Sequence, residues 1–325
     1  MIEQISAPHI PVMLSEVIES LSPKDGGTYI DGTFGAGGYT RAILESADCR
    51  VIAIDRDKTA LDAAQSWVSD YKGRLELVHG EFGTVQEHIQ TLGYDRVDGF
   101  VLDIGVSSMQ IDQPERGFSF RFDGPLDMRM DSEMGQTAAD VVNEMDEDDL
   151  ADVIYKYGEE RMSRRIARAI VIARKEARIE TTAQLADIIR SVMPKKHDKI
   201  DPATRTFQAL RIYVNDELGE LERALESSQN ILKENGRLVV VTFHSLEDRI
   251  VKNFLRDKSG LQKSVSRHLP DIPLKENATF RLENKKALES TKEENLKNPR
   301  ARSAKLRYAI KTHRSENAKM EVSGQ

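Results

Sequence analysis

A glycine-rich loop at residues 31–38 (DGTFGAGG) is the first feature whose residue types could bind a ligand. Its glycines allow a sharp turn and a close approach of the backbone to a ligand, and the start of the helix expected after it offers unpaired N–H groups. The dinucleotide fingerprint G-x-G-x-x-G, counted from Gly35, would need a third glycine where the chain has Thr40. The loop therefore favours another nucleotide-like ligand over NAD, with a purely structural turn as the alternative.

Acidic and aromatic side chains follow the neighbouring strands. Asp55 ends an apolar strand, and a carboxylate at that place can accept hydrogen bonds from both hydroxyls of a ribose. Asp103 ends a later strand, and Phe82 follows the strand between them, where it could stack on an adenine. The alternatives are solvated strand-end acids and simple packing of the ring.

A histidine and several polar groups follow the last apolar strand, in residues 242–249 (TFHSLEDR). His244 is there a candidate catalytic residue, as is Asp103, although a histidine after a strand often has only a structural role. His9, within residues 8–12 (PHIPV), is a weaker candidate.

Two basic runs stand out in a chain whose net charge is −7. Residues 297–314 hold seven Lys or Arg and no acid, and residues 161–178 hold seven Lys or Arg and one Glu. Such islands can neutralise phosphates, and the alternative is an ordinary solvated face. The candidate RNA-binding residues of the first run are Arg300, Arg302, Lys305 and Arg307.

The elements that must position these residues alternate regularly at the start of the chain. Apolar runs predict strands at residues 28–31, 50–55, 75–79 and 97–103, with helices between them at 40–45, 58–69 and 84–92. This rhythm indicates βαβ units, an α/β fold class and a parallel sheet covered on both faces.

The rhythm stops at about residue 111. We predict a helical insertion over residues 111–205, which separates a first part of the α/β core (1–110) from a second part (206–325) with a basic C-terminal tail. The second part should hold one long helix over residues 210–232 with Gly236 as its C-cap, a buried strand at 237–243 and an edge strand at 304–311. Residues 257–298 are interpreted as a loop or a weakly ordered arm.

Composition narrows the class of protein further. The chain has 325 residues, 39% of them hydrophobic and 31% charged, which is typical of globular domains. Its single cysteine, Cys49, excludes an internal disulfide and a cysteine-based zinc cage, and the seven histidines show no ligand spacing, so we expect no metal site. We see no signal peptide and no membrane-spanning run, and expect a cytoplasmic protein with no membrane partner.

Together the glycine loop, Asp55 as the acceptor for a ribose and Asp103 at the end of the fourth strand fit S-adenosylmethionine better than a dinucleotide. The chain resembles the bacterial RsmH (MraW) family of class I, Rossmann-like methyltransferases, from about His9 to Lys311. Eight motifs carry the resemblance, in order: HIPVMLSEV (9–17), DGTFGAGG (31–38), AIDRD (53–57), LDIGVSSMQ (102–110), RGFSFRF (116–122), DMRM (127–130), VTFHSLEDR (241–249) and NPRARSAK (298–305).

The resemblance implies a set of residues that bind S-adenosylmethionine. They are Gly37, Gly38, Tyr39, Asp55, Phe82, Asp103 and Gln110. Tyr39 replaces the histidine that is common in the family, and we expect its backbone to matter more than its side chain.

The resemblance also implies an activity, transfer of a methyl group to the exocyclic N4 of a single cytidine, cytidine 1402, in the decoding (P-site) region of 16S rRNA. The RNA would be held within the small ribosomal subunit or a late precursor, with the helical insertion as an RNA-recognition domain. An exocyclic amine needs no cysteine adduct, so direct in-line attack is expected, with Cys49 at the far edge of the sheet. The sequence does not decide whether the chain forms a homodimer.

Two other functions are compatible with the residues. One is a Rossmann oxidoreductase or another adenosine-ligand enzyme. The other is a non-catalytic ribosome-assembly factor on a methyltransferase fold.

Overall fold

The computed structural model describes residues 11–194, 201–260 and 278–312. They form two compact units: the described residues up to Gly105 together with those from Gly219 onward, and Val106–Leu218. His9 and the end of the basic run at residues 297–314, residues 313–314, lie outside the described residues.

The first unit is built on one sheet with the strand order β3-β2-β1-β4-β5-β8-β6, and β7 also pairs with β8. Neighbours among β1 to β5 are parallel, whereas β8 is antiparallel to β5. This arrangement confirms the predicted α/β, Rossmann-like core. The strands are β1 (Thr28–Asp31), β2 (Arg50–Asp55), β3 (Leu75–His79), β4 (Val97–Asp103), β5 (Leu232–Thr242), β6 (Phe280–Arg281), β7 (Leu288–Glu289) and β8 (Lys305–Lys311).

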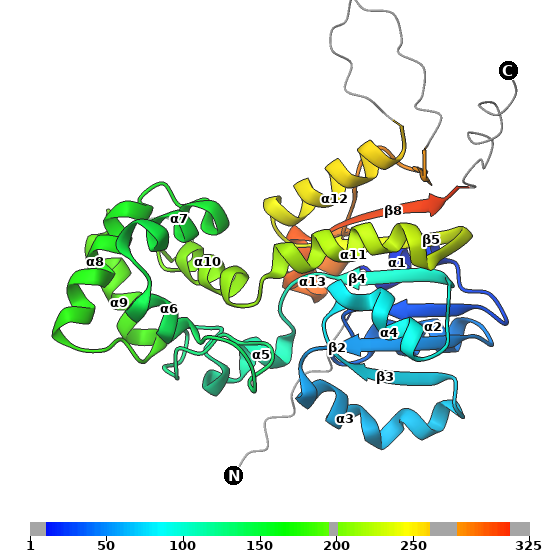
Figure 1. The fold of residues 1–325 in the computed structure, drawn as a ribbon, viewed down its shortest axis with the longest axis horizontal. Helices are drawn as coiled ribbons and strands as arrows, with labels where there is room; N and C mark the ends of the chain where they lie inside the picture. The colour runs from blue at the N-terminus through cyan, green and yellow to red at the C-terminus, as the bar shows by residue number, and fades with distance from the viewer. Residues whose placement is uncertain (1–10, 195–200, 261–277, 313–325) are drawn as a thin grey trace, which may run out of the picture. The chain divides into compact units, whose positions relative to one another are not determined.

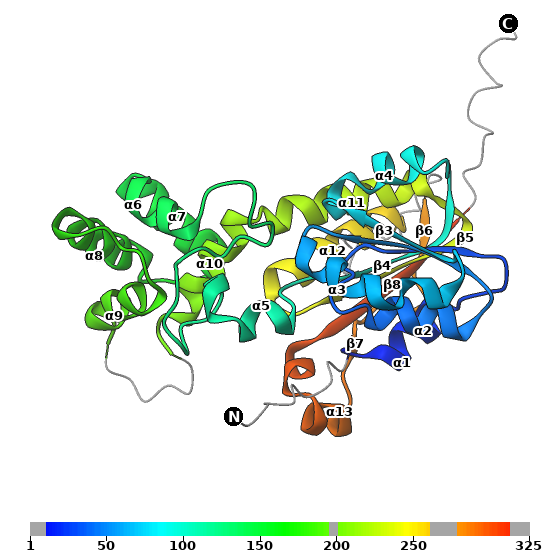
Figure 2. The ribbon, with the colours of Figure 1, turned by 90° about the horizontal axis from the view of Figure 1, so that it is seen from below.

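Helices cover both faces of this sheet, as the nearly unbroken apolar strands require. Figure 2 shows α4 and α11 on one side of the sheet and α1 and α2 on the other. The apolar side chains of α4, α11 and α12 share one buried cluster with the strands. The helices of this unit are α1 (Leu14–Leu21), α2 (Gly38–Ser46), α3 (Lys58–Val68), α4 (Val85–Thr91), α11 (Glu217–Ile231), α12 (Ser245–Lys258) and α13 (Lys292–Lys297).

The second unit is helical and has a core of its own, which includes Leu150, Ile166, Leu185 and Leu210. Its helices, green in Figure 1, are α5 (Ser108–Asp112), α6 (Ala138–Glu144), α7 (Glu147–Gly158), α8 (Ser163–Glu176), α9 (Thr182–Val192) and α10 (Thr204–Val214). This unit extends past residue 205, where the sequence placed its end, because α10 packs against α7.

The long helix predicted over residues 210–232 is wrong, because the chain breaks between α10 and α11. Asn215 uses its side-chain amide to bond the carbonyl oxygens of Met128 and Arg211, and Asp216 has a left-handed φ of 46°. Gly236 is not the C-cap of α11 either. The helix ends at Ile231, the chain continues directly into β5, and the left-handed residue of that stretch is Asn235.

Two further expectations for the second half of the chain need correction. The strand at residues 304–311 is not an edge strand, because β8 lies between β5 and the short strands β6 and β7. The segment 257–298 is not simply a loop, since its described part contains β6, β7 and α13. Among the helices that the structure describes, none is long and apolar enough to cross a membrane.

Candidate active site

Three acids end three adjacent strands. Asp31 is the last residue of β1, Asp55 of β2 and Asp103 of β4, and β1 lies between the other two strands. The carboxyl ends of parallel strands meet at one edge of a sheet, which is where α/β proteins bind ligands. The structure therefore brings Asp55 and Asp103, which the sequence singled out, to the same edge of the sheet as Asp31.

Asp31 holds the glycine loop in place. One of its carboxylate oxygens accepts a hydrogen bond from the Thr40 hydroxyl at 2.7 Å, and the other accepts one from the Thr33 N–H at 3.2 Å. Its side chain is fully buried, and this burial raises its pKa to about 6 despite the two bonds. Thr40 stands where the dinucleotide fingerprint would need its third glycine, and it is thus a structural partner of Asp31.

Asp55 contacts the same loop from the next strand. Its Oδ2 accepts a hydrogen bond from the Gly35 N–H at 2.7 Å, and its Oδ1 accepts one from the Asp57 N–H at 2.8 Å. Burial raises its pKa to about 6. A carboxylate has about four acceptor positions, so the half-buried Asp55 can still accept the two hydroxyls of a ribose.

Gly37 and Gly38 leave no room for side chains at the start of α2. Gly37 has a φ of 76°, and a Cβ there would lie 2.7 Å from Cζ2 of Trp67. A Cβ on Gly38 would collide with the ring of Pro11. The end of the loop therefore packs between Trp67 on one side and Pro11 on the other.

The Tyr39 side chain has a structural partner in addition to the backbone role expected for this residue. The ring is buried, and its hydroxyl donates a hydrogen bond to the carbonyl oxygen of Val12. Burial, together with the charges of Asp103 and Asp31, raises the pKa of Tyr39 well above its usual value, so the hydroxyl keeps its proton. Next to Val12, the Met13 N–H donates to Oε1 of Glu294 on α13 at 2.6 Å.

Phe82 lies three residues after the end of β3 and is half-buried. Its ring packs against the core cluster, and its Cβ would be 3.3 Å from a Cβ on Gly32. The next residue is fixed as well, because the Gly83 N–H donates to Oε2 of the buried Glu220 at 2.7 Å. Phe82 thus borders the glycine loop, as stacking on a bound adenine requires.

Asp103 has an unsatisfied buried oxygen. Its N–H donates to the Thr33 hydroxyl oxygen at 2.7 Å, which fixes the backbone, but its Oδ1 is buried and has no hydrogen-bond partner among the described residues. Burial raises its pKa well above the usual value, and the charges of Asp31 and Glu247 add to this effect. A buried polar atom without a partner is costly in a folded protein and calls for a ligand that satisfies it.

His244 acts as the N-cap of α12. Its Nδ1 accepts from the Glu247 N–H at 3.5 Å, and its Nε2 lies 2.7 Å from Oε1 of Glu247. The buried Glu247 in turn accepts the N–H groups of Phe243 and His244 at 2.8 and 3.2 Å. Glu247 is a site residue that the sequence reasoning missed, although a polar cap followed three residues later by Glu is a known signal of a helix start.

A hollow of about 330 Å³ adjoins His244. Arg302 and Lys305, two of the candidate RNA-binding residues, line this hollow, and Arg302 is exposed. Arg300 is exposed as well. The fourth candidate differs, because the mostly buried Arg307 donates to both oxygens of Asp248 at 2.7 and 3.3 Å.

Gln110 belongs to the helical unit and is buried near the start of α5. Its Oε1 accepts the Ser107 N–H at 3.1 Å, and its own N–H donates to the Ser107 hydroxyl at 3.2 Å. These reciprocal bonds form a capping box, which gives Gln110 a clear structural role.

A sequence model of the MraW methylase family matches residues 6–312 of the chain. The chain belongs to the MraW methylase family. It is similar to proteins named ribosomal RNA small subunit methyltransferase H in three bacteria. The identities are 56% for Paramagnetospirillum magneticum (94% of this chain, 96% of that protein), 57% for Maricaulis maris (94% and 91%) and 57% for Azorhizobium caulinodans (98% and 91%).

Membership of the MraW family confirms the expected methyltransferase class and S-adenosylmethionine as the cofactor. The geometry fits this cofactor. Asp55 retains acceptor capacity for the hydroxyls of a ribose, and Oδ1 of Asp103 is buried without a partner among the described residues. The Rossmann oxidoreductase is thereby excluded as an alternative.

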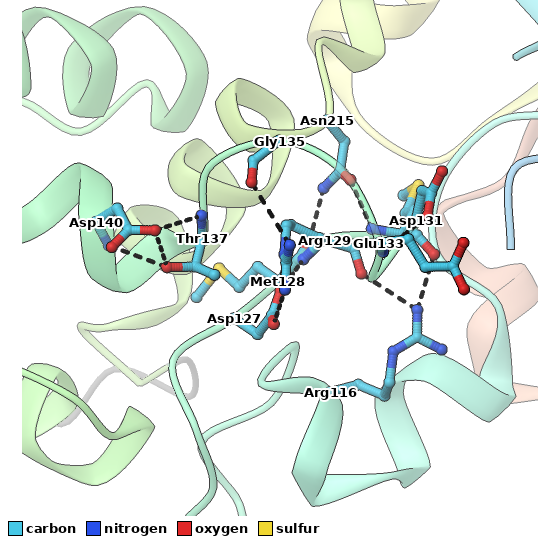
Figure 3. Close-up of polar contacts among 11 residues, drawn as sticks. Arg116, Asp127, Met128, Arg129, Asp131, Glu133, Gly135, Thr137, Asp140 and Asn215 are labelled. Carbon is cyan, nitrogen blue, oxygen red and sulfur yellow. Dashed lines mark hydrogen bonds and ion pairs between the residues drawn. The ribbon is translucent and has the colours of Figure 1, made fainter.

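The family motif at residues 127–130 (DMRM) forms a tightly held turn in the helical unit (Figure 3). Met128 has a left-handed φ of 63°, which is uncommon for a residue with a side chain. Asn215 accepts the Met130 N–H at 2.7 Å and donates to the Met128 carbonyl at 2.8 Å. Arg129 pairs with Asp127 at 2.8 Å, which raises the pKa of Arg129 above its usual value. Sequence reasoning had given Asn215 no role.

Proposed function

We propose that this chain transfers a methyl group from S-adenosylmethionine to N4 of cytidine 1402, in the decoding region of 16S rRNA, within the small ribosomal subunit or a late precursor in the cytoplasm. The named relatives support the small-subunit substrate. The observation that carries the choice of an amine is the unsatisfied Oδ1 of Asp103 at the end of β4.

The first unit supplies most of the proposed cofactor site. The backbone of Gly37, Gly38 and Tyr39 is the proposed contact to the cofactor, and the Tyr39 hydroxyl bonds the start of α2 to Val12. Asp55 accepts the ribose hydroxyls and Phe82 stacks on the adenine. The resemblance to the family adds Asp103 and Gln110 to the proposed set.

Asp103 is the proposed acceptor for the cytosine amine. The lone pair of an exocyclic amine is delocalised into the ring, so the amine must be oriented and its N–H bonds accepted before it attacks a methyl group in line. The buried Oδ1 of Asp103 is available for such an N–H. S-adenosylmethionine supplies an electrophilic methyl group on a cationic sulfonium, and a positive charge beside Asp103 favours its ionised form.

Cys49 supports direct attack without a covalent intermediate. It immediately precedes β2, at the opposite end of the strand from Asp55, and its buried thiol lies 3.4 Å from the carbonyl oxygen of Ile43. Burial raises the pKa of this thiol, which disfavours the nucleophilic thiolate. The cysteine adduct that C5 methylation of a pyrimidine requires therefore has no candidate residue in this chain, since Cys49 is its only cysteine.

For the surrounding RNA we propose phosphate contacts from Arg300, Arg302 and Lys305. Arg302 and Lys305 line the hollow beside His244. Arg307 is engaged with Asp248, so we propose that it contributes mainly by holding β8 to α12.

The test is methyl transfer from labelled S-adenosylmethionine to small subunits from a strain that lacks the enzyme. Late precursor particles and protein-free rRNA serve as parallel substrates. Label at a single cytidine in one of the particles supports the proposal. Tight cofactor binding without label in any of the three substrates would contradict it and favour the non-catalytic assembly factor.

A further inference from the structure

A second hollow, of about 280 Å³, lies between α12, β8 and the loop after β6. Among the described residues, four basic side chains line it and no acidic side chain does: Lys252, Arg256, Lys285 and Arg307. In a chain with a net charge of −7, this concentration of positive charge indicates an anionic ligand.

Two of the four cations are available to a ligand. Lys252 and Lys285 are exposed, and neither forms an ion pair or side-chain hydrogen bond with another described residue. Arg256 pairs with its neighbour Asp257 at 3.0 Å, and Arg307 pairs with Asp248. The two lysines can thus neutralise phosphates without breaking an internal contact.

The floor of the hollow is apolar and partly aromatic. Leu255 is buried, Leu282 is half-buried, and the half-buried Tyr308 adds an aromatic ring. A cationic rim over such a floor fits a nucleotide, whose base packs on apolar or aromatic side chains while its phosphates meet lysines. An acidic peptide would match the rim but not the floor.

The second hollow adjoins the hollow beside His244 along β8. Lys305 lines the first hollow and Arg307 lines the second. Residues two apart in a strand point to the same face, and both side chains contact Asp248 on α12. One face of β8 thus connects the two hollows.

We propose that the second hollow binds an unpaired nucleotide of the substrate RNA that flanks the methylated cytidine. This inference rests on the proposed rRNA substrate and adds to it a second RNA subsite. The subsite strengthens binding of the RNA and leaves the cofactor site unchanged.

The test is a charge reversal, Lys252→Glu with Lys285→Glu, compared with the same change at Lys24 and Lys72. The control lysines precede β1 and β3, at the amino ends of these strands. The control pair therefore changes the net charge by the same amount, but at a place away from the hollow. Binding of protein-free 16S rRNA is measured by fluorescence anisotropy over a range of salt concentrations. Tyr308→Leu tests the floor without a change of charge.

We expect the double variant to bind the RNA about tenfold more weakly than the control pair. Log affinity decreases linearly with log salt, and this slope should become shallower by about one to two in the double variant. Each contact to a single-stranded phosphate contributes about 0.7 to the slope, and the variant loses two lysines. Tyr308→Leu should weaken binding without changing this slope. Affinity for S-adenosylmethionine should stay within about twofold of wild type.

Equal affinity and slope in the two charge-reversed pairs would overturn the proposal. A loss seen with the intact subunit but not with protein-free rRNA would overturn it as well and would indicate a ribosomal protein at this hollow. If the wild-type protein methylates no rRNA substrate, the proposed function fails. The anisotropy comparison reports on the hollow separately, since it needs no methyl transfer.

Discussion

The hydroxyl of Tyr39, at the start of α2, donates a hydrogen bond to the carbonyl oxygen of Val12, so the helix that follows the glycine loop is bonded to the segment before α1. The neighbouring Met13 N–H is held by Glu294 from α13. Residues 281 positions apart are thus joined beside the glycine loop.

Tyr39→Phe should weaken S-adenosylmethionine binding about fivefold, because a buried hydrogen bond is worth about 1 kcal/mol and its loss leaves the Val12 carbonyl unpaired. Isothermal titration calorimetry measures the affinity, and quenching of Trp67, which packs on Gly37, gives a second readout. Tyr71→Phe is the control, since its hydroxyl makes only an exposed 3.4 Å contact with Glu45. Equal affinities in the two variants would contradict a role for the Tyr39 hydroxyl.

Asp55→Ala should abolish measurable cofactor binding. The change removes the acceptor for the ribose hydroxyls and frees the Gly35 N–H that shapes the loop. Asp62→Ala on the exposed face of α3 is the matched control, because it loses only a surface ion pair with Lys58. Near wild-type affinity of Asp55→Ala by calorimetry would refute the assignment.

The raised pKa of Asp55 predicts a pH dependence of stability. Its pKa is about 6 in the folded protein, whereas the ordinary pKa of an aspartate, 3.8, applies to the unfolded chain. Between these two values the folded state binds more protons than the unfolded state. The contribution of Asp55 to the free energy of unfolding therefore falls as pH rises from about 4 to above 6.

Thermal unfolding of the wild type and of Asp55→Asn at several pH values isolates this effect from other carboxyl groups. The wild type should lose stability relative to the variant as pH rises, by up to about 3 kcal/mol. A constant difference between the two proteins would show that Asp55 has an ordinary pKa.

His244→Asn should keep methyl transfer within about threefold of wild type, because asparagine is a good N-cap and the geometry gives His244 a capping role. His244→Ala should lower the free energy of unfolding by about 1 kcal/mol. If His244→Asn folds with wild-type stability but has lost methyl transfer, the imidazole has a chemical role.

Asn215→Ala should destabilise the helical unit by about 2–3 kcal/mol, since it leaves the Met130 N–H and the Met128 carbonyl unpaired in a buried turn. Asn230→Ala, at an exposed position of α11, is the control and should change stability little. Denaturant unfolding measures both, and equal midpoints would contradict the role of Asn215 in holding the turn.

The strand-end acids could be predicted from sequence because each ends an apolar run, and parallel strands place such ends together. The long-range hydrogen bonds beside the glycine loop could not be predicted. Tyr39 meets Val12, and Glu294 meets Met13, only through the tertiary fold. The apolar spacing from residue 210 to 232 continues across the break at Asn215, because Leu210 on one side and Leu221 and Leu225 on the other are all buried. The strand β8 was predicted at an edge because its partners β6 and β7 have only two residues each.

The central claim, methylation of a cytosine amine oriented by Asp103 without a cysteine adduct, is tested most directly by the identity of the modified nucleoside. Wild type, Cys49→Ser and Asp103→Ala are incubated with S-adenosylmethionine and unmethylated small subunits, and the rRNA is digested and analysed by mass spectrometry. We predict N4-methylcytidine at cytidine 1402 for wild type and Cys49→Ser, and a rate lower by about 100-fold or more for Asp103→Ala. 5-Methylcytidine, or loss of product in Cys49→Ser, would contradict the account.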